Sequence, residues 1–237
     1  MSIDSSETAI DAALRRMARD WYGYGWWEAT CWFIGPEPGR PEKEDTLRKR
    51  CEAWIRIGSG ELVDCKSHHF GFGWYDWHRE APPPHTQPTW RQLIRLLLAL
   101  RSGRPPELED IRSYQQRCWG MRKNEQEGET CAIELCSLAA PALKFKKNVP
   151  FDPNCFIGQR SEVIRARIQT YKPKLVVFYG LGHREQYQRI AGCAFGVGQP
   201  VKMGSTCVVL TPHPVSLGLG KSYWLELAAR LRRNGCF

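Results

Sequence analysis

Four apolar runs of strand length, separated by segments with helical periodicity, constrain the fold of this 237-residue chain more than any other feature. The runs lie at residues 30–34, 131–136, 174–180 and 206–210. Strands that alternate with helices form parallel sheets with helices on both faces. The sequence therefore predicts an α/β fold, specifically a three-layer α/β/α sandwich around a central four-stranded parallel sheet.

Helical periodicity fills the connections between these runs. Apolar faces at helical spacing extend over residues 7–20, 90–100, 108–119, 161–171 and 222–234. A further helix is expected to begin near Pro41 and to end before Gly58. The sequence has no apolar run of bilayer-spanning length and no signal-peptide pattern. We therefore expect one cytoplasmic domain over residues 1–237 with no membrane partner, and the sequence says nothing of oligomeric state.

The balance of charge favours a polyanionic partner. The chain has 34 lysines and arginines against 25 acidic residues, which gives a net charge of +9. Basic residues recur along the whole sequence, which indicates nucleic acid before a membrane surface. The ten cysteines include no Cys-x-x-Cys pair, and several lie in the apolar runs, where a free cysteine behaves as a small hydrophobe. We therefore expect reduced thiols.

Two short motifs follow the first and the last of the four runs. They are Gly-Pro-Glu-Pro-Gly at residues 35–39 and His-Pro-Val-Ser at residues 213–216. Ligands of open α/β sheets bind at the carboxyl ends of the strands, so Glu37 and His213 are expected to face one crevice. A carboxylate and an imidazole together suit acid–base chemistry. Taken singly, Glu37 is also compatible with a solvated turn carboxylate, and His213 with a core or capping histidine.

With these motifs in this order, the chain resembles the uracil-DNA glycosylase superfamily, whose members share a four-stranded parallel sheet between helices. In that superfamily a glycine, two variable residues and Pro-Gly or Pro-Tyr follow the first strand, as residues 35–39 do here. His-Pro or Asn-Pro with a nearby serine follows the last strand, as in residues 213–216. The resemblance extends over residues 30–233, includes a similar third strand and turn at 174–182, and leaves residues 58–88 as an insertion.

The resemblance implies a monofunctional DNA glycosylase, which flips a base out of DNA and hydrolyses its N-glycosidic bond to leave an abasic site. Glu37 would orient and deprotonate the attacking water and stabilise the cationic sugar. His213 would donate a hydrogen bond to the departing base. This chemistry needs no metal and no other cofactor.

The resemblance also implies DNA contacts in the segment that follows His213. Ser216 and the backbone amides near Gly218 would bind phosphates, and Lys221 would add positive charge. Leu217 or Leu219 would fill the gap that a flipped nucleotide leaves in the stack, as an apolar wedge does. DNA is therefore the expected partner.

Two departures from the superfamily pattern concern the base. Its second strand commonly carries an asparagine that pairs with uracil, and Glu134 stands at the matching position. A buried, protonated Glu134 would accept from cytosine N4 and donate to N3, because cytosine reverses the donor and acceptor of uracil. The uracil-specific branch has a tyrosine where Gly39 leaves room beside C5. The expected substrate is therefore a C5-modified cytosine, such as those of phage genomes, in an antiviral role.

Several alternatives stay open at this point. Glu134 could be a structural carboxylate paired with an arginine, and the substrate could be uracil or a mismatched base in base-excision repair. An alternative from another class is a non-catalytic protein that binds DNA in the same groove. Covalent trapping of the sugar by His213 is disfavoured because the basic insertion typical of that variant is missing. A phosphate-binding α/β enzyme is disfavoured because neither motif is a glycine-rich loop that enters a helix.

The insertion at residues 58–88 holds four of the six histidines and a dense run of aromatic residues. This composition favours a DNA-facing loop that stacks on bases or on a bulky substituent. The alternative is a small packed core, because aromatic clusters are usually buried. The residues concerned are Trp74, Tyr75 and Trp77 for stacking, and Lys66, His68, His69 and Arg79 for phosphate contacts.

Zinc is a further alternative for the same insertion. Its candidate ligands are Cys65, His68, His69 and His78. The spacing is permissive, and the second half of a standard zinc motif is missing. The sequence alone therefore predicts no metal site.

Overall fold

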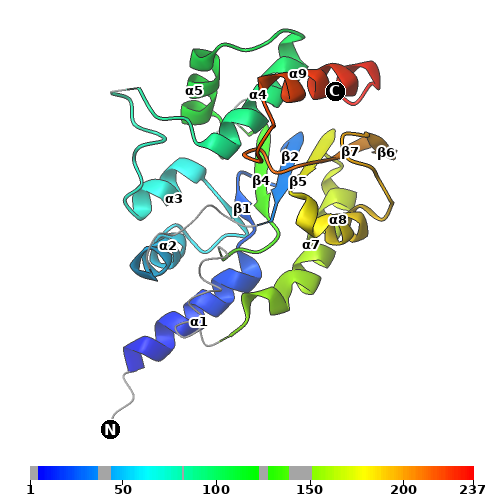
Figure 1. The fold of residues 1–237 in the computed structure, drawn as a ribbon. Helices are drawn as coiled ribbons and strands as arrows, with labels where there is room; N and C mark the ends of the chain where they lie inside the picture. The colour runs from blue at the N-terminus through cyan, green and yellow to red at the C-terminus, as the bar shows by residue number, and fades with distance from the viewer. Residues whose placement is uncertain (1–4, 37–43, 82, 123–127, 139–150) are drawn as a thin grey trace.

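A seven-stranded sheet, in the order β3-β1-β4-β2-β5-β7-β6, lies at the centre of the protein (Figure 1). The computed structural model describes residues 5–36, 44–81, 83–122, 128–138 and 151–237. The four central strands are mutually parallel and buried along their whole length, and they correspond to the four apolar runs of the sequence. They are β4 (Thr130–Glu134), β2 (Cys31–Gly35), β5 (Leu175–Tyr179) and β7 (Thr206–Thr211). The α/β class is confirmed.

Three short strands extend this central part, so the prediction of a four-stranded sheet was incomplete. β1 (Gly23–Tyr24) pairs antiparallel with β4 and parallel with β3 (Leu62–Val63). On the other side, β6 (Val201–Met203) pairs antiparallel with β7. Strands of two or three residues are too short to carry an alternating pattern, which is why the sequence did not reveal them.

Helices cover both faces of the sheet (Figure 1). Leu and Trp side chains of the helices around α4 pack on one face, and Ile and Tyr side chains of α7 and α8 pack on the other. The first group is α1 (Ser5–Asp20), α2 (Glu44–Arg56), α3 (Cys65–Gly71), α4 (Pro88–Ser102), α5 (Leu108–Arg117) and α9 (Lys221–Arg233). The second group is α7 (Ile157–Tyr171) and α8 (Arg184–Ala191), and short 3-10 turns lie at Pro153–Phe156 and Leu181–His183. Within the described ranges, none of these helices is long and apolar enough to cross a membrane.

The insertion packs against the first face instead of extending as a loop. The His69 ring stacks on Trp90 of α4 with centroids 5.5 Å apart, and Trp77 meets Trp90 edge-on at 5.1 Å. His68 and His69 are 0% and 2% exposed, so the prediction that they lie near phosphates is wrong. The packed alternative is confirmed for these side chains, because clustered aromatic rings bury more apolar area against α4 than an exposed loop would.

A buried arginine of α7 ties the end of α1 to the end of β4. The Arg160 guanidinium is 0% exposed and lies 4.3 Å from the Tyr22 ring centroid. Burial lowers its pKa to about 10, so it stays charged at neutral pH. Its N–H groups donate to five backbone carbonyls at 2.6 to 3.2 Å, those of Ala18, Arg19, Trp21, Glu134 and Leu135. One side chain therefore satisfies the carbonyls of both segments.

The sequence led us to expect reduced thiols throughout, and this prediction is wrong for one pair of cysteines. Cys207 of β7 forms a disulfide with Cys236, with Cα atoms 5.4 Å apart. Cys31, Cys51, Cys65 and Cys131 are free thiols that are fully buried in the apolar core. The pair is 29 residues apart in sequence, and α9 brings the end of the chain back to β7. Sequence spacing gives no sign of such a return.

Candidate functional site

The carboxyl ends of the central strands bring four side-chain positions into one row on the face covered by α4. In the parallel register, Glu134 of β4 pairs with Gly35 of β2, and Tyr179 of β5 pairs with Thr211 of β7. The register between β2 and β5 sets Gly35 beside Tyr179. All four residues are buried. This row lies at the edge where open α/β sheets bind their ligands.

Tyr179 fills the space in front of Gly35. A Cβ atom at position 35 would clash with Cζ and Oη of Tyr179, so a larger residue fits there only if the Tyr179 ring moves. Burial raises the pKa of the Tyr179 hydroxyl, so this hydroxyl stays protonated. We did not predict Tyr179 as a site residue. It lies near the end of the predicted strand at residues 174–180 and shares the face of Glu134, which is the signal that could have found it.

Substituting Gly35→Ala is expected to lower the free energy of unfolding by about 1–3 kcal/mol, because the added methyl group overpacks a site that Tyr179 already fills. Urea unfolding of the two proteins would measure the change. Gly158→Ala is the matched control, because this glycine is exposed in α7 and no atom lies within 4 Å of an added Cβ. An unchanged midpoint for Gly35→Ala would mean that the Tyr179 ring moves aside at no cost.

His213 lies in the turn after β7, at the same edge of the sheet, and is half-buried. Its ring meets the Tyr179 ring edge-on, with centroids 5.6 Å apart. Burial lowers the pKa of His213, so the imidazole is neutral at neutral pH. The backbone N–H of Val215 donates to Nδ1 at 3.4 Å, which leaves the proton on Nε2. His213 therefore offers one neutral N–H donor beside Tyr179.

Glu134 is held at the end of β4 by its own backbone and is 7% exposed. Its N–H donates to the Tyr22 carbonyl at 2.8 Å, and its carbonyl accepts from Arg160 at 2.6 Å. The hydrogen bond from Arg160 therefore holds the backbone carbonyl of Glu134. On β4, Glu134 points to the same face as Ala132, which is the face of Tyr179.

Two predicted residues of the first motif, Glu37 and Gly39, lie outside the described residues and stay predictions. The described chain leaves β2 at Pro36, whose carbonyl accepts from the Cys136 N–H at 2.8 Å. This bond fixes the start of the motif next to the end of β4.

The segment after His213 is a compact turn with exposed side chains. The Ser216 N–H donates to the His213 carbonyl at 2.9 Å, and the Leu219 N–H donates to the Ser216 carbonyl at 3.2 Å. Ser216 is exposed, Leu219 is partly buried, and Leu217 is 103% exposed, the largest exposure among the exposed large apolar residues. Lys221 is the first residue of α9, whose first turn has no acidic residue. The N-terminus of this helix favours an anion.

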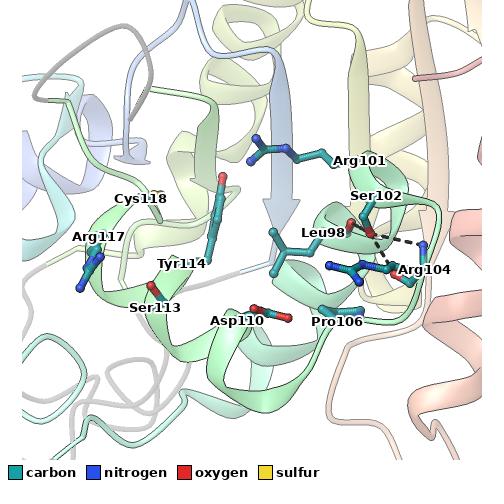
Figure 2. Close-up of a pocket in the computed structure, with 10 residues that line it drawn as sticks. All are labelled: Leu98, Arg101, Ser102, Arg104, Pro106, Asp110, Ser113, Tyr114, Arg117 and Cys118. Carbon is teal, nitrogen blue, oxygen red and sulfur yellow. Dashed lines mark hydrogen bonds between the residues drawn. The ribbon is translucent and has the colours of Figure 1, made fainter.

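A cavity of about 650 Å³ lies apart from this edge, between α4 and α5 (Figure 2). Of the predicted site residues that the structure describes, none lines it, although Arg101, Arg104 and Arg117 do. The Arg101 guanidinium is 3.2 Å from the Glu129 carboxylate, which also accepts from the Tyr114 hydroxyl at 2.7 Å. Glu129 directly precedes β4, so the cavity lies near the amino ends of the strands. The Glu129 carboxylate neutralises part of the positive charge of the cavity. We therefore do not regard the cavity as a second candidate for the base-binding site.

Among the predicted site residues that the structure describes, His213 and Glu134 are brought to one edge of the sheet, with Ser216, Leu217, Leu219 and Lys221 on the chain that leaves it. Tyr179 joins them as the residue between His213 and Gly35. The chain also matches no protein-family model, and no curated protein shows significant similarity to it.

Proposed function

We propose that the protein is a monofunctional DNA glycosylase that acts on a flipped base at the carboxyl edge of its central sheet. The observation that carries the proposal is the position of His213, a neutral N–H donor, beside the buried Tyr179 and at the same edge as Glu134. A buried acceptor–donor set at the end of parallel strands suits the edge of a nucleobase.

The proposed chemistry separates two developing charges. Cleavage of the N-glycosidic bond leaves electrons on the departing base and positive charge on the sugar, and water then adds to the sugar carbon. The Nε2–H of His213 stabilises the base anion by a hydrogen bond. Glu37, two positions after Gly35 in sequence, accepts the proton of the water and stabilises the cationic sugar.

We further propose that the base is a cytosine with a substituent on C5. Glu134 is buried at the edge, where one carboxyl group can accept from N4 and, when protonated, donate to N3. Burial of a carboxyl group favours the protonated form that this pairing requires. Gly39 contributes no side chain that would block C5. Excision of such bases would act against phage genomes that contain them, while removal of uracil would place the enzyme in base-excision repair.

The exposed turn supports an interaction with DNA. Leu217 presents a whole apolar side chain to solvent, on the segment that leaves His213. A wedge of this kind can occupy the space of a flipped nucleotide. The N-terminus of α9 and Lys221 then lie within a few residues of this wedge, where a phosphate would be bound.

The experiment that tests the proposal is base release from DNA, detected by mass spectrometry. The substrates are duplexes that contain uracil, cytosine, 5-hydroxymethylcytosine or glucosylated 5-hydroxymethylcytosine. Release of a modified cytosine alone supports the whole proposal, whereas release of uracil supports a glycosylase with another specificity. No release from any substrate would favour the non-catalytic DNA-binding protein.

Glu134→Gln is expected to lower the ratio of cytosine-type to uracil release by about 10-fold or more, because one good bidentate pair discriminates between bases by about 1–3 kcal/mol. A glutamine amide can present its carbonyl and NH2 group in either order, so it pairs with the O4/N3 edge of uracil as well as with the N4/N3 edge of cytosine. Competition assays with both bases in one mixture would measure the ratio. Glu226→Gln, which changes an exposed carboxylate of α9, is the control. An unchanged ratio would exclude Glu134 from base recognition.

A further inference from the structure

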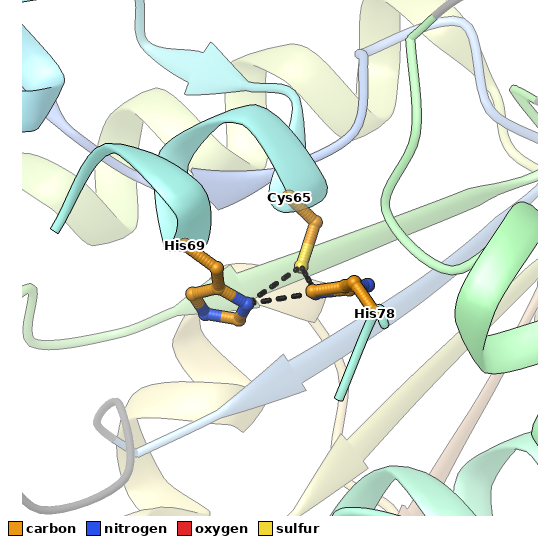
Figure 3. A group of neighbouring side chains, drawn as sticks. All are labelled: Cys65, His69 and His78. Carbon is orange, nitrogen blue, oxygen red and sulfur yellow. Dashed lines mark hydrogen bonds between the residues drawn. The ribbon is translucent and has the colours of Figure 1, made fainter. Parts of the chain in front are cut away.

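Three side chains of the insertion converge in the buried layer next to α3. Cys65 begins α3, His69 lies one turn later on the same face of the helix, and His78 comes from the turn that follows (Figure 3). Cys65 Sγ is 3.7 Å from His69 Nδ1 and 3.8 Å from His78 Nε2, and the two nitrogen atoms are 2.8 Å apart. All three residues are buried. A thiol and two imidazoles thus point at one small volume.

A chain of hydrogen bonds fixes the proton of His69. The Arg50 carbonyl, 3.0 Å from His68 Nε2, can only accept, so this nitrogen carries the proton and His68 Nδ1 is an acceptor. The Tyr24 hydroxyl, 3.2 Å from that Nδ1, donates to it. The same hydroxyl oxygen, 3.2 Å from His69 Nε2, therefore accepts from His69. The proton of the neutral His69 ring is on Nε2, and its Nδ1 lone pair points at Cys65 and His78.

This arrangement has the features of a metal site with an ordered surrounding. Metal-binding histidines usually donate their second N–H to a fixed acceptor, which sets the tautomer and the ring orientation. The Tyr24 hydroxyl has this role for His69. The carboxylate of the neighbouring Asp64 caps α3 by accepting from the Ser67 N–H at 2.7 Å, and it also accepts from the backbone N–H of Arg122 at 3.2 Å, so it is engaged elsewhere.

We propose that Cys65, His69 and His78 bind a zinc ion whose fourth ligand is water, and that the ion fastens the turn of His78 to α3. One thiolate and two imidazoles are ligands that zinc favours. With a Zn–S distance of about 2.3 Å and Zn–N distances of about 2.0–2.1 Å, tetrahedral geometry requires S–N separations of about 3.5 Å and an N–N separation of about 3.3 Å. The two S–N distances are close to this value, and the nitrogen atoms need to separate by about 0.5 Å.

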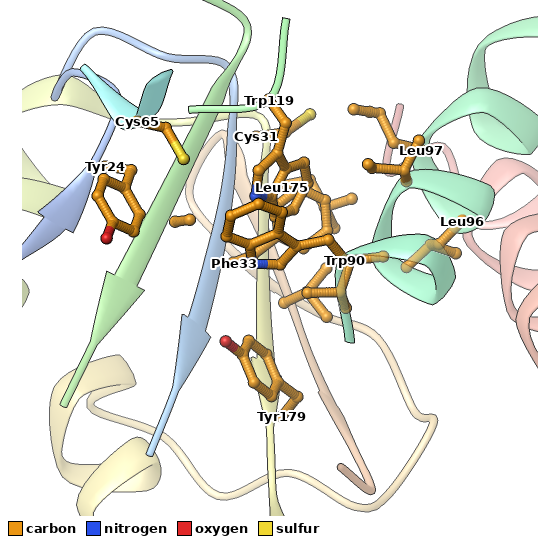
Figure 4. Packing of buried hydrophobic residues seen from close by; sticks show 14 of the residues in the cluster. Tyr24, Cys31, Phe33, Cys65, Trp90, Leu96, Leu97, Trp119, Leu175 and Tyr179 are labelled. Atoms are coloured by element: carbon orange, nitrogen blue, oxygen red, sulfur yellow. The ribbon is translucent and has the colours of Figure 1, made fainter. Parts of the chain in front are cut away.

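The site lies on the same face of the sheet as the proposed base site. Figure 4 shows Tyr24 and Cys65 on the face that also carries Phe33 and Tyr179. Tyr24 belongs to β1 and pairs with Ala132 of β4, which lies two residues before Glu134. Zinc binding is independent of base excision, however, because none of its ligands reaches the row at the carboxyl edge.

The test is the metal content of the full-length protein, purified from cells grown with added zinc and measured by elemental mass spectrometry. We expect about one zinc ion per chain in the wild type, and background zinc in Cys65→Ala and in His78→Ala. Cys51→Ala is the matched control, because Cys51 is a buried free cysteine of α2 outside the cluster. It is expected to keep the zinc.

Two measurements on the wild type keep the proposal testable if the variants fail to fold. Cobalt added to the chelator-treated protein should produce a thiolate-to-cobalt charge-transfer band and the visible bands of a four-coordinate site. Zinc at 100-fold excess over its dissociation constant should raise Tm by roughly 5 °C or more over the metal-free protein. Wild-type protein with no more zinc than Cys65→Ala, no charge-transfer band and no rise in Tm would overturn the proposal.

Discussion

Replacing His213 with alanine is expected to slow base release by about 10²–10³-fold, because one positioned donor to a developing anion contributes this much to the rate. The effect arises because the His213 ring is neutral and carries its proton on Nε2, at the edge beside Tyr179. Single-turnover assays with enzyme in excess would measure the chemical step directly. DNA binding should change little, since the alanine variant keeps the exposed turn.

Two further variants separate catalysis from binding. His213→Asn replaces the imidazole with an amide donor and is expected to restore part of the activity, which a role in packing alone would not produce. Glu37→Gln removes the proposed base and should also retain DNA binding. If both Glu37→Gln and His213→Ala behave as the wild type in every assay, the protein binds DNA without excising a base.

Replacing Arg160 with methionine is expected to lower the free energy of unfolding by about 3–5 kcal/mol, because each buried acceptor left without a partner costs about 1–3 kcal/mol. Five backbone carbonyls at the ends of α1 and β4 would lose their donor, and each buried acceptor without a partner is costly. Chemical denaturation would give the change in unfolding free energy. Since Glu134 provides one of these carbonyls, base selectivity should fall as well.

The control for Arg160 is Arg165→Met, on the same helix. Arg165 is partly buried and makes one long hydrogen bond, at 3.4 Å to the Arg189 carbonyl, so its loss is expected to cost less than about 1 kcal/mol. Equal effects of the two substitutions would contradict the view that Arg160 holds the two segments together.

The sequence predicted the central strands because buried parallel strands are continuous apolar runs. It did not predict β1, since Gly23–Tyr24 lies in an aromatic-glycine connector with no strand pattern. Gly23 has a positive φ of +142°, and a Cβ atom at this position would clash with the Ala132 carbonyl. Both reasons for a glycine at position 23 become visible only when β1 is paired with β4. Helix α8 was also missed, because Arg184–Ala191 is short and its apolar residues are few.

The candidate site was predicted where a residue lies at the end of a strand or shortly after it. Glu134 and His213 belong to this group, and their common edge follows from the parallel order of the strands. His68 and His69 were placed wrongly because a histidine next to lysine and aromatic residues has the same composition in a DNA-binding loop and in a packed core. The convergence of His78 with Cys65 and His69 depends on the turn after α3, which no sequence spacing specifies.

The pairing of β3 with β1 has a consequence for any attempt to shorten the protein. β3 lies within the insertion, and its backbone covers the side of β1 that does not face β4. Removing residues 58–88 would leave that side of β1 as an open sheet edge, which is a template for aggregation. It would also expose Trp90, whose ring the insertion covers. The insertion is thus a protective edge of the sheet, and a minimal version of this protein has to retain it.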